Sequence, residues 1–121
     1  MAEPGKVIRR EEIPTYEVVP GSSLRMVTGE EHGLGLCMIM AQYPSGTGPG
    51  PHRHPNASAI YVAEGSGVFT VGDDELAAEA GDVVVVPAMA WHSFRNTGEG
   101  CLRVVGADEG ARHDAEFPDT T

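Results

Sequence analysis

Three histidines in two short stretches of the sequence have the spacing needed to bind a metal ion. His52 and His54 are separated by one residue in GPGPHRHPNASA, and His92 follows an apolar run in VVVVPAMAWHSFRN. Because side chains alternate in direction along a β-strand, His52 and His54 point to one face, where two imidazoles can converge on one ion. A third ligand has to come from another strand, and His92 opens one. His52, His54 and His92 are therefore candidate ligands of one metal ion, and packed or surface histidines are the alternative for a pair with this spacing.

The other two histidines have less suitable surroundings. His32 lies in the charged turn GEEHGLG, and His113 lies in the acidic stretch DEGARHDAEFPDTT. Charged and glycine-rich surroundings are typical of exposed positions. Both histidines are therefore predicted to be solvated and to take no part in the site.

The elements that must position the three histidines are predicted to be β-strands. The 16 glycines and nine prolines divide the chain into short segments, and few windows show the apolar spacing of a helix. The predicted strands are 15–19, 23–29, 34–43, 58–65, 67–72, 75–80, 82–87, 91–96 and 101–107. Short strands separated by turn residues at this rate are typical of a sandwich or barrel. The run VVVV before Pro87 does not alternate, which predicts a strand covered on both faces.

The 121 residues suit one compact domain without internal repeats. The barrel is predicted over residues 1–107. The remaining segment, 108–121, is acidic and is expected to form a loose C-terminal tail, docked by Phe117.

The charge of the chain excludes several classes of partner. Eight Lys and Arg against 18 Asp and Glu give a net charge of −10, which argues against nucleic acid or an anionic membrane as a partner. The N-terminus has no apolar signal-peptide core, and no apolar run is long enough to span a bilayer. A cytoplasmic protein that acts on a small molecule is the expectation.

The spacing around the first two histidines resembles the first signature motif of the cupin superfamily. The motif covers residues 46–65. The matching positions are Gly46, His52, His54 and Gly65. Ser58 stands where this family usually has a glutamate. The resemblance therefore implies two metal ligands here, His52 and His54, and puts the usual acidic ligand in question.

The stretch around His92 resembles the second cupin motif, over residues 81–96. The matching positions are Gly81, Pro87, His92 and Asn96, with Met89 where glycine is common. The resemblance implies a single-domain cupin, a small jelly-roll β-barrel in which the two motifs face one another. It also implies that His92 is the third metal ligand.

Three histidines without the glutamate indicate a particular chemistry. Three neutral imidazoles leave a divalent ion with its full 2+ charge, which favours an anionic chelating substrate. Three protein ligands also leave up to three open octahedral positions, enough for a bidentate substrate and dioxygen. Three-histidine cupin sites resemble those of thiol and diketone-cleaving dioxygenases, which bind Fe(II). Ser58 is predicted to hold a metal-bound water or a substrate atom, with simple space filling as the alternative.

Two other functions remain open on the same residues. Zinc, nickel or manganese suits the same ligands and would support a cyclase, isomerase or lyase that works without a redox step. A cupin that binds a small molecule without turnover is the third possibility.

The predicted surroundings of the metal are apolar. Alternation along the strands places Ile60, Phe94 and Asn96 on the interior face, and Met38 and Met40 are predicted to complete the substrate pocket. Small cupins resemble one another in pairing through barrel faces and N-terminal strands. This resemblance implies a homodimer, in which VIRREEIPTYEVV supplies an exchanged strand.

Overall fold

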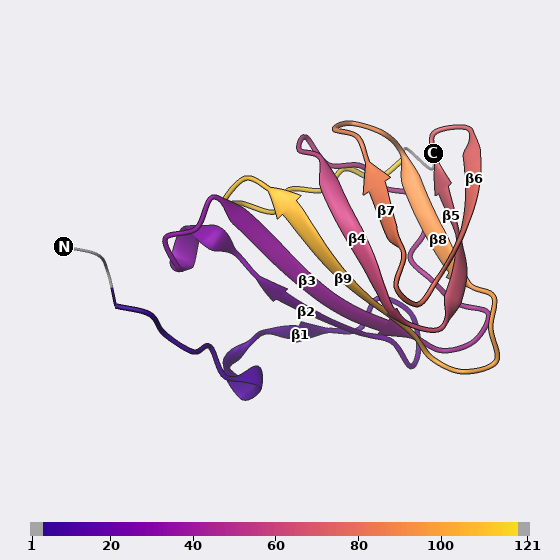
Figure 1. Cartoon of the computed structure of the whole chain (residues 1–121). Coiled ribbons are helices and arrows are strands. Elements are labelled where there is room, and N and C mark those ends of the chain that lie inside the picture. Colours follow the sequence, from indigo (N-terminus) through magenta and orange to yellow (C-terminus); the bar gives the residue numbers. More distant parts are fainter. Residues whose placement is uncertain (1–3, 119–121) are drawn as a thin grey trace.

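Residues 4–118, which the computed structural model describes, form nine strands in two antiparallel sheets (Figure 1). The six-stranded sheet has the order β1-β2-β3-β9-β4-β7, and the three-stranded sheet has the order β6-β5-β8. The strands are β1 (Thr15–Tyr16), β2 (Ser23–Val27), β3 (Leu36–Tyr43), β4 (Ser58–Glu64), β5 (Ser66–Val71), β6 (Asp74–Glu79), β7 (Val83–Val86), β8 (His92–Asn96) and β9 (Leu102–Glu109). Two short 3-10 turns, η1 (Arg10–Glu12) and η2 (Gly29–Glu31), are the only helical elements in the described range, and neither could cross a membrane. The predicted all-β fold is confirmed.

Every predicted strand overlaps an observed one, and the clearest differences lie at the two ends of the chain. β1 has only two residues, because the chain turns where the Ser22 hydroxyl accepts hydrogen bonds from the backbone N–H groups of Val18 and Val19 at 3.0 and 2.9 Å. At the other end, β9 continues to Glu109. Asp108, which the sequence placed in the tail, therefore lies within a strand.

The four valines of β7 alternate in burial. Val84 and Val86 are buried, whereas Val83 is 57% exposed and Val85 is 66% exposed. The prediction that this strand is covered on both faces is wrong. The physical reason is that no other layer of the described residues covers the outer face of the six-stranded sheet, so Tyr61 of the neighbouring strand β4 is exposed as well.

The core lies between the inner faces of the two sheets. Its buried members are Ala41, Tyr43, Ile60, Val62, Phe69, Ala78, Val84, Val86, Leu102 and Val104. Phe94 of β8 stacks on Phe69, with ring centroids 4.8 Å apart, and forms a T-shaped pair with Tyr43 at 5.3 Å. Burial raises the pKa of Tyr43 to about 12. This aromatic packing fixes β8, the strand that begins with His92.

Asn96, at the end of β8, is a structural residue. Its side-chain amide donates hydrogen bonds to the carbonyls of Tyr43 and Gly100 at 2.9 and 2.8 Å, and its side-chain oxygen accepts one from the N–H of Gly98 at 2.9 Å. Asn96 is 1% exposed, so its own side-chain amide is removed from water. A buried polar group has to be hydrogen-bonded, and these three bonds satisfy the amide of Asn96.

Candidate metal centre

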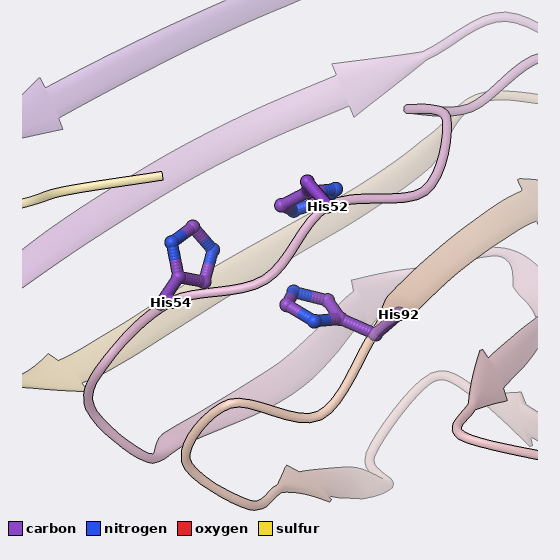
Figure 2. A group of neighbouring side chains, drawn as sticks. All are labelled: His52, His54 and His92. Atoms are coloured by element: carbon purple, nitrogen blue, oxygen red, sulfur yellow. The ribbon is translucent and has the colours of Figure 1, made fainter. Parts of the chain in front are cut away.

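The structure brings the three predicted ligands together. Figure 2 shows the rings of His52, His54 and His92 pointing toward a common region, and one ring nitrogen of each lies within 4.8 Å of the others. The ring centroid of His52 lies 4.2 Å from that of His92, and the centroid of His54 lies 5.1 Å from both. Three ring nitrogens gathered this closely make the group a candidate site for one metal ion.

Backbone pairing holds the first motif against β8. His52 lies outside the named strands and forms an isolated antiparallel bridge with His92. The N–H of each residue donates to the carbonyl of the other, at 3.0 Å from His52 and 2.9 Å from His92. The N–H of Met89 also donates to the carbonyl of His54 at 2.8 Å. Two segments almost 40 residues apart are thereby fixed side by side, which sets the relative positions of the imidazoles.

The hydrogen bonds of the three rings leave the same nitrogen free on each. Nδ1 of His52 lies 2.8 Å from the carbonyl oxygen of Gly50, and Nδ1 of His92 lies 3.0 Å from that of Ala90. Nδ1 of His54 lies 2.8 Å from the carbonyl oxygen of Asp114. A carbonyl can only accept, so each Nδ1 carries the proton and each Nε2 keeps its lone pair. Metal-binding histidines typically have this arrangement, and the three residues therefore fit a divalent ion.

Burial favours the uncharged form of two of the imidazoles, those of His52 and His92. It lowers the pKa of His52 to about 4, with a smaller contribution from the neighbouring histidines. It also lowers the pKa of His92. An imidazole has to be neutral to bind a metal. Both of these side chains therefore have the ligating form at neutral pH without first having to lose a proton.

A mostly apolar cavity of about 240 Å³ adjoins the three histidines. Its walls include Ile39, Ala41, Tyr43, Ser58, Ile60, Phe94, Val104, Asp108, His113 and Phe117. Ile60 and Phe94 lie on these walls, where the sequence placed them. Ser58 is 7% exposed and also lines the cavity. Its contact with a water or substrate atom stays a prediction.

Three of the predicted pocket residues lie elsewhere. Met38 is 38% exposed, and neither Met38 nor Met40 lines the cavity. β3 instead turns Ile39 and Ala41 inward, because alternation fixes which residues share a face and does not fix which face is interior. Asn96 does not line the cavity either, because its side chain is hydrogen-bonded to backbone groups such as the carbonyl of Tyr43.

The C-terminal segment folds back over the site, which corrects the prediction of a loose tail. Glu116 forms an antiparallel bridge with Arg53, and their side chains form two hydrogen bonds of 3.0 Å. The Arg53 guanidinium also lies 4.5 Å from the centre of the Trp91 ring. Phe117 lies on the cavity wall, in line with its expected docking role, although it is 70% exposed. These contacts place the segment beside the metal ligands.

His113 lies on the cavity wall, so the prediction that it is solvated is wrong. Its Nδ1 lies 3.1 Å from a carboxylate oxygen of Asp108, and its ring centroid lies 4.7 Å from that of His54. The sequence contains a signal for Asp108: it continues the alternation of inward residues along β9. It contains none for His113, whose position depends on the folded tail. His32 is half-buried instead of solvated, and it lies outside the cavity walls.

Comparison with known families supports the assignment that the motifs suggested. The cupin domain model matches residues 39–107, more than half of the chain. This chain belongs to the cupin family. A search of curated proteins finds no match by sequence.

Solved structures similar to this cupin have low sequence identity. A cupin 2 conserved barrel domain protein from Rhodopseudomonas palustris is 22% identical, with a TM-score of 0.74 over 89% of this chain and 77% of the other. A predicted oxalate decarboxylase from Thermotoga maritima is 23% identical, with a TM-score of 0.70 over 87% of this chain and 99% of the other. The oxalate decarboxylase of Lactobacillus farciminis, in a formate complex, is 17% identical, with a TM-score of 0.80 over 88% of this chain. This cupin spans only 33% of the Lactobacillus enzyme, and 28% of the Bacillus subtilis oxalate decarboxylase. At these identities the likeness establishes the jelly-roll fold.

Proposed function

We propose that this cupin binds one Fe(II) ion through His52, His54 and His92 and oxidises a small chelating anion with dioxygen. The observation that supports the proposal most is the clustering of three imidazoles, each with Nε2 left free by a hydrogen bond at Nδ1. Ferrous iron held by three protein ligands supplies open positions for both a chelating substrate and dioxygen.

The charge of the site supports an anionic substrate. The three histidines would leave the 2+ charge of the ion uncompensated. The Asp108 carboxylate lies within 4.8 Å of a ligand atom of His54, but it is hydrogen-bonded to His113 and lies outside the three-histidine cluster. In an apolar cavity the attraction between the ion and an anion is stronger than in water, because the local dielectric constant is lower.

The cavity residues have distinct roles in this proposal. Ile60, Phe94 and Val104 form an apolar wall that excludes water from the reacting groups. Ser58 places a hydroxyl on the same wall, where it donates a hydrogen bond to an anionic substrate oxygen. The volume of about 240 Å³ suits a compact substrate of a few non-hydrogen atoms beside the ion.

Oxygen consumption tests this function. Protein loaded with Fe(II) is expected to consume dioxygen with one or more members of a panel of small thiol, diketone and hydroxy acids. His92→Ala is expected to abolish the uptake, because one of three ligands is lost, whereas His32→Ala should retain it. If the protein loaded with zinc, nickel or manganese converted a compound of the same panel in the absence of oxygen, this result would contradict the dioxygenase proposal.

A cyclase, isomerase or lyase reaction without a redox step is the second candidate. It is favoured by the Asp108–His113 pair, which provides a hydrogen-bonded imidazole on the cavity wall, and such imidazoles serve as proton acceptors. Manganese is a reasonable ion for it, since the Bacillus subtilis oxalate decarboxylase has Mn(II) centres. Tight binding of a panel member without any turnover would instead favour a binding protein.

We also propose that two copies of the chain pair through the outer face of the six-stranded sheet. Two uncharged rows run across this face in register, Met38–Ala107–Ala59–Val85 and Met40–Val105–Tyr61–Val83. Single apolar residues on a surface are ordinary, but a contiguous exposed patch is typical of an interface. Figure 1 shows the segment before β1 running outward from the same sheet, where it could reach a partner.

The oligomeric state tests the pairing. Light scattering after gel filtration is expected to give twice the chain mass of 12.7 kDa. Val85→Arg should shift the protein toward the monomer, because it places a charge in the interface. Leu76→Arg is the matched control, since Leu76 is 42% exposed on the other sheet. A monomeric wild-type protein at high concentration would refute the proposal.

A further inference from the structure

Asp108 and His113 form a second group of polar side chains on the cavity wall. Asp108 is the β9 partner of Ser58 in the register of the six-stranded sheet. A carboxylate thus lies one strand away from the position where cupins usually have a glutamate. The Asp108 carboxylate contacts the ring of His113 at 3.1 Å, and their side chains are only 8% and 14% exposed. The pair is therefore built into the wall of the cavity.

His113 lies beside the three metal ligands but does not belong to their cluster. Ligand atoms of His54, Asp108 and His113 lie within 4.8 Å of one another, as do those of His52, His54 and His92. The two groups share only His54. His113 is therefore not within 4.8 Å of the ligand atoms of all three metal ligands. His113 lines the same cavity as the three ligands, so its ring borders the space beside the metal site.

The hydrogen bond with Asp108 determines what His113 offers to the cavity. An ionised carboxylate only accepts hydrogen bonds, so the proton of the neutral ring lies on Nδ1. Nε2 then has a lone pair and no proton, and it can only accept. A group that contacts this nitrogen has to present a hydrogen, as a hydroxyl or an enol does.

The backbone holds His113 in place from both sides. On one side the N–H of Glu30 donates to the carbonyl of Ala111 at 2.8 Å. On the other side Arg53 and Glu116 exchange two backbone hydrogen bonds of 3.0 and 2.9 Å. Because the backbone is held on both sides of His113, this residue loses little further freedom when a ligand binds. A specificity-determining residue requires such a fixed position.

We infer that Nε2 of His113 accepts a hydrogen bond from a hydroxyl or enol group of a substrate whose carboxylate binds the metal. The inference rests on the proposed metal site and narrows its substrate class to small carboxylates that bear a hydroxyl or enol group. His113 touches the substrate, and Asp108 positions His113 by fixing its tautomer.

The binding of two matched anions to the Co(II)-loaded protein tests this role. Glycolate has the hydroxyl hydrogen, and methoxyacetate has a methyl group in its place. Visible absorption of Co(II) reports the binding of both. We expect glycolate to bind up to about tenfold more tightly than methoxyacetate, as one hydrogen bond to an uncharged group allows. In His113→Ala this preference should disappear while the affinity for Co(II) stays unchanged.

Two further variants separate positioning from general damage. Asp108→Asn retains the shape but can donate to Nδ1, so the preference for glycolate should fall with Co(II) affinity intact. Arg112→Ala changes the neighbouring tail residue, whose side chain is 70% exposed, and should leave the preference unchanged.

The possible failures are distinguishable. An equal preference for glycolate in the wild type and His113→Ala would overturn the inference and leave the metal site standing. Loss of Co(II) from His113→Ala would overturn it by showing that His113 is a metal ligand. A wild-type protein that binds no Co(II) would overturn both the inference and the proposed function.

Discussion

Replacing His92 by alanine is expected to lower the affinity for Co(II) by at least about a hundredfold. Loss of a residue that only supports a metal ligand typically costs about 10- to 100-fold in affinity, and loss of a ligand costs at least as much. His92 is 5% exposed, and one of its ring nitrogens lies within 4.8 Å of a ring nitrogen of both His52 and His54. The measurement is a competition titration with a coloured chelator, followed at the visible bands of Co(II).

The control for this variant is His32→Ala. His32 is half-buried and does not line the cavity. Its replacement should leave Co(II) affinity within about threefold of wild type, which is the scatter expected of a change away from the site. Equal affinities for His92→Ala and the wild type would show that the three rings are packed together for a reason other than metal binding.

Gly48→Ala is expected to destabilise the protein by about 3 kcal/mol and to weaken metal binding as well. A Cβ at Gly48 would overlap the carbonyl oxygen of Phe94 and lie 2.8 Å from its carbonyl carbon. Both atoms belong to the backbone of β8, so a side-chain rotation cannot relieve the clash. Overpacking of this kind typically costs about 1–3 kcal/mol, and a clash with backbone atoms is at the upper end of this range. A loss of about 3 kcal/mol corresponds to a Tm lower by about 10 °C for a chain of this size.

The metal site is affected because the same loop leads to His52. The carbonyl of Thr47 accepts from the N–H of Asn96 at 2.8 Å, and the loop then reaches the bridge between His52 and His92. Displacing the loop from β8 would therefore separate two ligands. Calorimetry gives the Tm, and the Co(II) titration gives the affinity.

Gly50→Ala is the matched control for this prediction. A Cβ at Gly50 meets nothing within 4 Å, and its φ is not in the left-handed region. The carbonyl that accepts from His52 belongs to the backbone and would be retained. Gly50→Ala should keep the Tm and the affinity close to wild type. If Gly48→Ala were equally harmless, the close contact between this loop and β8 would be wrong.

The strands and the three metal ligands could be predicted because both depend on local spacing. Turn residues mark the ends of each strand, and His52 and His54 are close enough in sequence for alternation to relate them. Predicting His92 as the third ligand also required the spacing of the second cupin motif. The structure adds the backbone bridge that places it against His52.

The parts that sequence reasoning missed depend on contacts between distant residues. Met38 and Ile39 are equally apolar, so local pattern alone could not show that β3 turns Ile39 inward. The C-terminal segment is held by Arg53 and Glu116, which are 63 residues apart. An acidic composition made the segment look solvated, yet pairing of one of its carboxylates with Arg53 brings His113 to the cavity.

The metal content of tag-free protein purified without oxygen tests the central claim most directly, beside the double variant His52→Ala/His54→Ala. The account predicts about one iron per chain in the wild type and none in the variant. Another divalent metal in the same amount would favour the reaction without dioxygen. A wild-type protein that contains no metal, and takes up none when Fe(II) is added, would contradict the three-histidine site itself.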